Sequence, residues 1–573
     1  MCISRGNGAF PVEKIGGRSQ TICGVLPTEK RGEYIVTTGA EALIESLKRE
    51  NVTEIFGYAG ATICPAADAL KHSDIHYTLV RTEQNAGHMA SGYSRISGKV
   101  GVCMVTSGPG ATNLITGIAT AYMDSIPMVA ITGQVESYLL GRDIFQEVDI
   151  TGAVAPFIKH SYLVKDVKSI PRVVKEAFHI ASTGRPGPVL IDIPIDVQKA
   201  KFEPVYPETV DIRGYKPSVK GNIKQIHRAA EAIRQAKKPV LCLGGGVISA
   251  GAQKEALEFA EKSQIPIVNT MMGLGIVPTD HPLYVGMIGS FGTPTANRTL
   301  AHSDLLILVG ARVANRAILQ PSEIGRRMKT IHIDVDPAEI GKNVDTTIPV
   351  VGDVKEVLLQ LMEQDTTAQT QDIEALQKSR QAELVRELPT KPGYAHPARV
   401  IRTLGHLMDD DAICCVDVGQ NQIWTCKHMT IKHGRFLTTG GLGTMGYSLP
   451  AALGAKVAAP DKQTVVVCGD GSFQMFENEL STLRNLGADV KLVMMENSVL
   501  GLVNEIQHSA YSGPFGVALD HSPDFGKLAD AYGIPHGEIR EDDEIEEKLA
   551  AMLAAPGPYI MVCHVDPDAK TGD

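Results

Sequence analysis

This chain lacks the features that mark membrane, nucleic-acid-binding and disulfide-stabilised proteins. No apolar run approaches the roughly 20 residues that a transmembrane helix needs. The formal net charge is −10, and no basic run is interleaved with aromatic residues, which argues against a nucleic-acid partner. The ten cysteines are scattered without metal-type spacing, so we expect reduced, mostly buried thiols in a cytoplasmic protein.

The sequence instead has material for several α/β domains. Its 573 residues suggest three or four domains, and 43% of them are hydrophobic. Strand-like runs alternate with helical spacing, and polar or Pro-containing stretches separate the blocks. We predict three parallel-sheet α/β domains, at 32–200, 221–362 and 397–567. Residues 1–31 are predicted to be a flexible extension without the apolar core of a secretory signal, and its acidic residues disfavour an organellar transit peptide.

The most informative motif is Asp470 between two glycines, followed 27 residues later by Asn497. The β-branched run before it predicts a buried parallel strand, helical spacing over 473–486 follows, and a second apolar strand at 490–495 stops near Asn497. Ligands bind at the carboxyl ends of such strands, so we expect Asp470, Asn497 and the carbonyl of Val499 to converge on Mg²⁺. The alternative, an ordinary turn with an Asp cap, does not explain the interval to Asn497.

This motif resembles the Gly-Asp-Gly and Asn signature of thiamine diphosphate enzymes. The segments 83–95, 106–113 and 121–134 closely resemble the acetolactate (acetohydroxyacid) synthase catalytic-subunit family, and the likeness extends over most of the chain. In that family the Glu matching Glu83 contacts N1′ of the cofactor's aminopyrimidine ring and promotes loss of the thiazolium proton. The resemblance gives Glu83 this catalytic role, whereas an isolated Glu here would be read as a first-turn helix acid.

The resemblance also assigns residues to two organic cofactors. It places at the thiamine diphosphate Gly419, Gln420, Gly443, Met445, Gly471 and Ser472, with Met445 as the apolar wedge that bends the cofactor. It places at FAD Arg185, Gly244, Gly245, Gly246, Thr270, Gly292, Arg312, Asp334 and Asp353. The alternatives are that Met445 only fills a core and that the central domain keeps its fold without a flavin.

The resemblance is weakest around the substrate. Several positions depart from the family's usual residues, and Ile506 stands where the family has a Trp. Gln146, Lys159 and Arg316 are retained and are predicted to be catalytic, the two cations by orienting the carboxylate of a second oxo acid. Surface cations are the alternative reading of Lys159 and Arg316. The predicted substrate pocket consists of Phe145, Leu502 and Ile506.

The resemblance implies an acetolactate synthase that uses thiamine diphosphate, Mg²⁺ and FAD. Such an enzyme decarboxylates pyruvate and ligates the two-carbon unit to a second 2-oxo acid, giving acetolactate or acetohydroxybutyrate in branched-chain amino acid biosynthesis. Because the two ends of the cofactor come from different subunits, we expect a homodimer or homotetramer, with a small regulatory subunit as a further candidate partner. The alternatives are a related decarboxylase, another carboligase or a flavin-linked oxidase, and a non-catalytic paralogue, against which Glu83, Asp470 and Asn497 argue.

Overall fold

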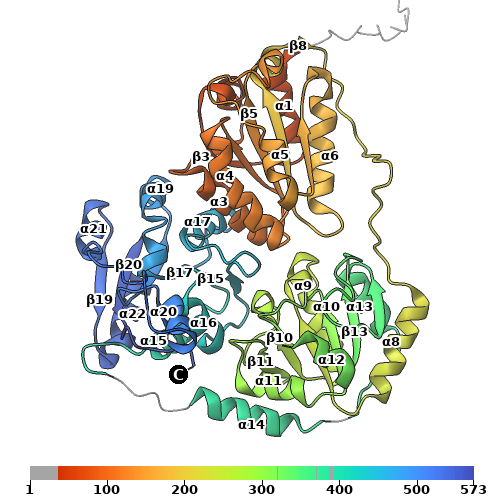
Figure 1. Ribbon diagram of the computed structural model, residues 1–573, viewed down its shortest axis with the longest axis vertical. Coiled ribbons are helices and arrows are strands. Elements are labelled where there is room, and N and C mark those ends of the chain that lie inside the picture. Colours follow the sequence, from red (N-terminus) through yellow and green to blue (C-terminus); the bar gives the residue numbers. More distant parts are fainter. Residues whose placement is uncertain (1–35, 319, 370, 386–390, 573) are drawn as a thin grey trace, which may run out of the picture.

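Three parallel sheets organise the chain. The computed structural model describes residues 36–318, 320–369, 371–385 and 391–572 (Figure 1). Each of three six-stranded sheets is parallel throughout and is covered by helices, so the predicted fold class is confirmed. The predicted extension over 1–31 lies outside the described residues.

The N-terminal sheet has the strand order β3-β2-β4-β5-β7-β6. Its strands are β2 (Glu54–Tyr58), β3 (His76–Leu79), β4 (Gly101–Val105), β5 (Met128–Gln134), β6 (His160–Leu163) and β7 (Pro188–Pro194). Its helices are α1 (Gly39–Arg49), α2 (Cys64–Lys71), α3 (Glu83–Ser97), α4 (Pro109–Met123), α5 (Ile150–Val154), α6 (Ile170–Ser182) and α7 (Ile195–Lys199). The short strands β1 (Thr37–Thr38) and β8 (Lys201–Phe202) pair antiparallel. Every residue of β4, β5 and β7 is buried because helices cover both faces of the sheet.

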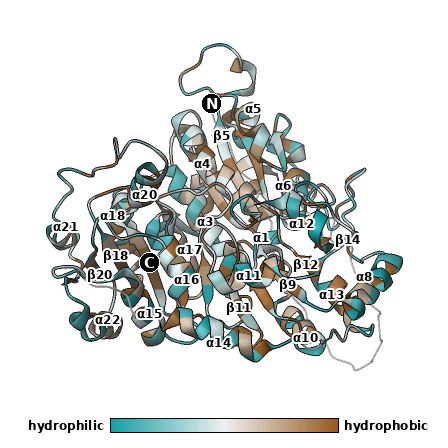
Figure 2. Cartoon of the chain, turned by 60° about the horizontal axis from the view of Figure 1, so that its bottom comes forward, coloured by the Kyte–Doolittle hydropathy of each residue, from teal (hydrophilic) through white to brown (hydrophobic). Residues whose placement is uncertain are grey.

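The central sheet has the order β11-β10-β9-β12-β13-β14. Its strands are β9 (Pro239–Leu243), β10 (Ile267–Asn269), β11 (Tyr284–Met287), β12 (Leu305–Val309), β13 (Lys329–Asp334) and β14 (Ile348–Val351). Its helices are α8 (Ile223–Gln235), α9 (Gly245–Ser249), α10 (Gln253–Ser263), α11 (Pro294–Ala301), α12 (Pro321–Arg327), α13 (Val354–Met362) and α14 (Ile373–Leu384). Apolar residues gather in the strands and polar residues on the outer helices (Figure 2).

The C-terminal sheet has the order β16-β15-β17-β18-β20-β19. Its strands are β15 (Ile413–Val416), β16 (Arg435–Leu437), β17 (Thr464–Gly469), β18 (Val490–Glu496), β19 (His536–Ile539) and β20 (Tyr559–His564). Its helices are α15 (Pro397–Leu407), α16 (Gln420–His428), α17 (Ser448–Ala458), α18 (Asp470–Phe473), α19 (Leu480–Leu486), α20 (Gly501–Ala510), α21 (Phe525–Ala531) and α22 (Ile545–Ala554). No helix among the described residues has the length and apolar character to span a membrane. The described cysteines are free, and all but Cys64 are buried.

The prediction of one continuous helix over 473–486 is wrong. The chain forms two helices there, α18 and α19, joined by a 3-10 turn at Glu477–Glu479. The break lets both Phe473 and Phe476 enter the core, where their rings pack edge to face with centroids 5.3 Å apart. It also turns Glu479 toward the N-terminal domain. Apolar spacing alone is compatible with a continuous helix and does not reveal this turn.

Helices α3 and α17 bring the N-terminal and C-terminal domains into direct contact. Glycine makes this close approach possible: a Cβ atom at Gly92 would collide with the carbonyl of Ala451, and one at Gly454 with the carbonyl of Met89. The two backbones therefore meet without intervening side chains, and α3 has a fixed position on the C-terminal domain.

Glu479 fixes the start of α3 across the same interface. Thr82, the residue before the helix, makes no capping hydrogen bond with its side chain. The Glu479 carboxylate instead accepts the amides of Arg81 (2.8 Å) and Thr82 (3.2 Å) and the side-chain amide of Asn85 (3.0 Å). Glu479 is 0% exposed. These bonds fix the two residues that precede α3 and one side chain in its first turn, so Glu479 positions the helix that Glu83 begins.

Replacing Glu479 by Ala is expected to destabilise this interface. The change removes an acceptor from four donors, the three across the interface and the Thr482 hydroxyl, at about 1–3 kcal/mol for each donor left buried and unpaired. We expect the melting temperature to fall by about 5 °C or more in thermal unfolding followed by circular dichroism. Glu479→Gln keeps one acceptor oxygen and should lose less. Equal melting temperatures for the wild type and both variants would contradict this role.

Candidate functional site

The Gly-Asp-Gly motif lies at the carboxyl end of β17, where the sequence places it. Asp470 Oδ1 accepts the amide of Gly471 (2.9 Å), and Oδ2 accepts the amides of Ser498 (2.7 Å) and Asn497 (3.3 Å). Burial raises the pKa of Asp470 to about 6, and these amides act in the opposite direction. The structure thus joins the ends of β17 and β18 through one carboxylate and brings Asp470 and Asn497 together.

The turn after β18 carries the other two predicted metal ligands. Asn497 Oδ1 accepts the amide of Val499 (3.3 Å), and Asn497 Nδ2 donates to Gln420 Oε1 (3.3 Å). One carboxylate, one amide oxygen and one backbone carbonyl form a hard oxygen set that suits Mg²⁺. The described part of the chain contains no group of three or more His, Cys, Asp or Glu side chains that could hold a metal. The predicted metal site therefore depends on this mixed set.

Gln420, a predicted cofactor contact, also bonds to residues that the sequence did not single out. Its Nε2 donates to Glu505 Oε2 (3.1 Å) and to the carbonyl of Ala569 (2.8 Å). Glu505 in turn accepts the amide (3.0 Å) and hydroxyl (2.9 Å) of Thr571. A Cβ atom at Gly501 would collide with Gln420 Oε1, so the small residue at the start of α20 leaves room for this side chain. The segment around Thr571 is therefore tied to both α16 and α20.

A buried carboxylate, Asp417, anchors the loop that carries the predicted wedge Met445. Asp417 Oδ1 accepts the amide of Gly446 (2.9 Å), and Oδ2 accepts the amide (2.9 Å) and hydroxyl (2.7 Å) of Ser448. The Met445 terminal methyl lies 3.7 Å from the position that a Cβ atom on Gly471 would take. The wedge and the Gly-Asp-Gly motif are therefore neighbours, as the resemblance implies. Ser472 is buried beside them, and its hydroxyl donates to the carbonyl of Gly469 (3.0 Å).

Glu83 lies in the N-terminal domain, at the first position of α3. Its Oε2 accepts the side-chain amide of Asn113 (3.0 Å), and its Oε1 lies 3.2 Å from the position of a Cβ atom on Gly110. This side chain is half-buried in the single chain.

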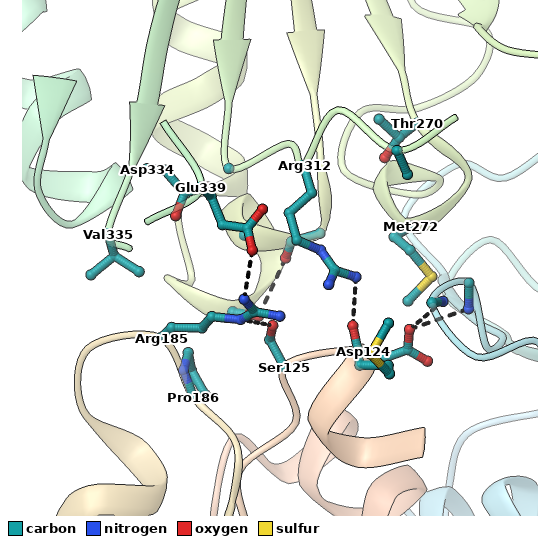
Figure 3. Close-up of a pocket in the computed structure, with 18 of the residues that line it drawn as sticks. Asp124, Ser125, Arg185, Pro186, Thr270, Met272, Arg312, Asp334, Val335 and Glu339 are labelled. Atoms are coloured by element: carbon teal, nitrogen blue, oxygen red, sulfur yellow. Dashed lines mark hydrogen bonds and ion pairs between the residues drawn. The ribbon is translucent and has the colours of Figure 1, made fainter. Parts of the chain in front are cut away.

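A cavity of about 900 Å³ lies where the three domains meet (Figure 3). Most of the predicted FAD contacts line it, namely Arg185, Gly245, Gly246, Thr270, Arg312, Asp334 and Asp353. Two do not: Gly244 packs against the turn after β12, and Gly292 forms a tight turn after β11. The lining also includes Gly443, which the sequence places at thiamine diphosphate, and Arg316. The volume is in the range of ordinary ligand sites.

Charged groups from two domains face one another in this cavity. Arg185 on the N-terminal domain reaches Glu339 (2.9 Å) and Asp336 (3.4 Å) of the central domain, and its Nε donates to Ser125 (2.9 Å). Arg312 donates to the carbonyl of Met123. These ion pairs tie the two domains together across the cavity.

Three acidic residues in the cavity differ in function. Burial raises the pKa of Asp334 to about 6. Asp353 caps helix α13 by accepting the amide of Lys355 (2.9 Å), a local role that the sequence did not separate from cofactor binding. Asp124 accepts the amide of Gly441 (2.8 Å) and so holds the C-terminal glycine loop, a role that was missed.

The four predicted catalytic residues do not gather in one place in this chain. Lys159 Nζ donates to the carbonyls of Ile180 and Thr183 and to the Tyr215 hydroxyl (3.0 Å). Burial lowers its pKa to about 8. Its ammonium therefore holds the end of α6 and the interdomain linker, a role different from the predicted one of orienting substrate. Lys159 is half-buried, with partners in the N-terminal domain and in the linker, and its catalytic role stays a prediction.

Arg316, Gln146 and the predicted pocket residues lie elsewhere. Arg316 is exposed in the three-domain cavity, 5.9 Å from the ring centre of Phe291. Gln146 has a φ of +62° in an N-terminal loop, next to Phe145, which is 85% exposed. Leu502 and Ile506 lie on α20, which buries none of its residues. The predicted pocket is therefore not enclosed by the described residues of one chain.

Comparisons with known proteins agree with this arrangement. Residues 37–153, 226–361 and 417–563 match the N-terminal thiamine-pyrophosphate-binding, central and C-terminal thiamine-pyrophosphate-binding domains of thiamine pyrophosphate enzymes. The acetolactate synthase of Arthrospira platensis is 44% identical over 550 residues, covering 93% of this chain and 94% of that protein. The chain belongs to the acetolactate synthase family of thiamine pyrophosphate enzymes.

Other members of the acetolactate synthase family are similarly close. The probable large subunit of Methanocaldococcus jannaschii is 43% identical over 546 residues, with 92% of both chains covered. The large subunit of Corynebacterium glutamicum is 44% identical over 521 residues, covering 89% of this chain and 83% of that protein. The first matched domain contains Glu83, and the last contains Asp470 and Asn497. The family's thiamine pyrophosphate domains thus correspond to the two parts of the candidate site.

Proposed function

We propose that this chain is the catalytic subunit of an acetolactate synthase, which decarboxylates pyruvate and joins the two-carbon unit to a second 2-oxo acid. The observation that carries the proposal is the Asp470 and Asn497 pair at the ends of two adjacent strands. It occurs in a chain 41–44% identical to acetolactate synthases over most of its length. Analysis of the products formed from pyruvate distinguishes this activity from that of a decarboxylase or an oxidase, and from the inactivity of a non-catalytic paralogue.

Different residues of the chain have different roles in the proposed reaction. Thiamine diphosphate, when bound, supplies a thiazolium carbon that attacks the ketone and accepts the electron pair released with carbon dioxide. Glu83 provides the carboxylate that exchanges a proton with the cofactor's aminopyrimidine N1′. Glu479 and Asn113 hold its helix and its side chain in place. Arg316 provides a guanidinium for the carboxylate of the second oxo acid, and Gln146 a polar group on the N-terminal loop.

Asp470, Asn497 and Val499 would hold Mg²⁺ at the diphosphate. Oxygen donors of this kind suit Mg²⁺, and the bonds from the Gly471 and Ser498 amides to Asp470 hold the turn in place. The absence of a side chain at Gly471 lets Leu500 pack against the motif, since a Cβ atom there would lie 2.9 Å from Leu500 Cδ2. The cation would supply positive charge opposite the diphosphate and so stabilise cofactor binding.

FAD would occupy the three-domain cavity. Arg185 and Arg312 offer cationic groups to a pyrophosphate, and Asp334 offers an acceptor to ribose hydroxyls. Gly245 and Gly246 line this cavity, and Gly246 packs closely on Gly310 in the turn after β12. The family resemblance gives the flavin a structural role, which the meeting of three domains at this cavity supports.

The exposure of the candidate site in the single chain supports a multimeric assembly. Glu83 is half-exposed and α20 buries no residue, so a second subunit would complete the enclosure in a homodimer or homotetramer. Several relatives are called large subunits. We infer that a small regulatory subunit is a further partner.

Mass spectrometry of products from purified enzyme with pyruvate is expected to show acetolactate and carbon dioxide. With 2-oxobutyrate added, we expect little preference for acetohydroxybutyrate, because Ile506 offers less apolar contact to the extra methyl than the family's Trp would. Ile506→Trp should raise the ratio of acetohydroxybutyrate to acetolactate by up to about tenfold. Acetaldehyde alone would indicate a decarboxylase, acetate an oxidase, and no carbon dioxide a non-catalytic paralogue.

Glu83→Gln should lower carbon dioxide release by about 100-fold or more while thiamine diphosphate still binds. Gln keeps the shape of the side chain but cannot exchange the proton. The matched control is Glu546→Gln, in the exposed first turn of α22 and remote from the site. Near-normal release by a folded Glu83→Gln protein would remove Glu83 from the mechanism.

Arg185→Met should weaken FAD binding by about tenfold or more, measured by retained flavin absorbance and by titration of the apoprotein. The control is Arg172→Met on the same domain, where the arginine is exposed and pairs only with Glu176 of its own helix. Full activity and stability in flavin-free protein that does not bind added FAD would contradict the proposed flavin site.

A further inference from the structure

A row of hydrogen-bonded polar side chains connects the ends of β18 and β20 to the turn that follows β18. Glu496 ends β18 and His564 ends β20, and the two residues are neighbours in the parallel register. His564 Nδ1 lies 2.8 Å from Glu496 Oε2, and both side chains are largely buried. The other carboxylate oxygen, Glu496 Oε1, accepts the hydroxyl of Ser498 (2.6 Å). Glu496 therefore links His564 to the turn whose Ser498 amide binds Asp470.

Ser498 needs such support because of its backbone conformation. Its φ is +57°, in the left-handed region that side chains other than glycine rarely adopt. Such a conformation costs about 1–3 kcal/mol and persists only where the surroundings hold it. Ser498 lies between Asn497 and Val499, so its conformation decides where the Asn497 amide and the Val499 carbonyl point.

His564 is fixed from the other side by a second carboxylate. Its Nε2 lies 3.4 Å from Glu538 Oε2, and Glu538 is also paired with Arg540 (2.7 Å). Glu538 is more exposed than Glu496 and makes no contact with Ser498 among the bonds of the described chain. The imidazole thus lies between the carboxylate of Glu496, which binds the turn, and the carboxylate of Glu538, which does not.

We propose that Glu496 and His564 are positioning residues for the cation site. His564 orients the Glu496 carboxylate, Glu496 holds the Ser498 hydroxyl, and Ser498 keeps the turn in the form that aims Asn497 and Val499 at the cation. The inference rests on the proposed Mg²⁺ site. Partners behind metal ligands commonly set the affinity for the metal, and losing one costs about 10–100-fold.

The test is calorimetric titration of Mg²⁺ into chelator-treated full-length protein with thiamine diphosphate in excess, with melting temperature as the measure of folding. Glu496→Ala and His564→Leu are expected to weaken Mg²⁺ binding about tenfold or more. His564→Gln, which keeps a donor toward Glu496, should recover most of the affinity. The matched control, Glu538→Gln, touches the same imidazole from outside and should change affinity by less than about twofold.

A Ser498→Gly background separates positioning from charge. Glycine adopts this φ without strain, so the turn no longer depends on the Glu496 bond. Glu496→Ala should then weaken Mg²⁺ binding by less than about threefold. The loss of a nearby negative charge would persist in this background, so an undiminished effect would overturn the positioning role.

Two further outcomes would overturn the proposal. Wild-type affinity in folded Glu496→Ala protein, or an equal loss in Glu538→Gln, would remove the positioning role while leaving the metal site intact. Thiamine diphosphate binding by the wild type that is tight and independent of any divalent ion would instead refute the metal site, and the positioning role with it.

Discussion

The contact between α3 and α17 is the constraint on which the rest of the site depends. Glycines at positions 92 and 454 let the two backbones touch, and Glu479 then binds the amides of the two residues just before α3. A parallel sheet offers loops at its strand ends but does not by itself orient a second domain. Here the docking of one helix pair fixes the position of the helix that Glu83 begins.

Buried carboxylates that accept backbone amides recur throughout the site. Asp417 anchors the wedge loop, Asp470 joins two strand ends, and Asp124 holds the C-terminal glycine loop from another domain. Burial raises the pKa of each of these carboxyl groups, and hydrogen bonds from the loops oppose the rise. Each carboxylate therefore loses solvation and gains several oriented donors, which makes the loops rigid without secondary structure of their own.

The sequence predicts those parts of the structure whose signals are local. The β-branched runs form β17 and β18, and the interval between Asp470 and Asn497 matches two strand ends that meet. The missed features are non-local. Glu479 lies 398 residues from Arg81, and Lys159 finds Tyr215 in a linker 56 residues away. Such pairings form only when the domains and the linker pack together, and the spacing of apolar residues in the sequence does not reveal them.

Helix α20 is much less buried than the elements around it. It buries none of its residues, whereas most of α17 is buried in the interdomain core. Segments with few buried apolar contacts open locally at a small fraction of the global unfolding free energy. The bonds between Glu505 and Thr571 are among its few side-chain ties to the domain. The helix that carries Leu502 and Ile506 is therefore expected to open more readily than the turn after β18, which a buried carboxylate holds, and to exchange its amide hydrogens faster.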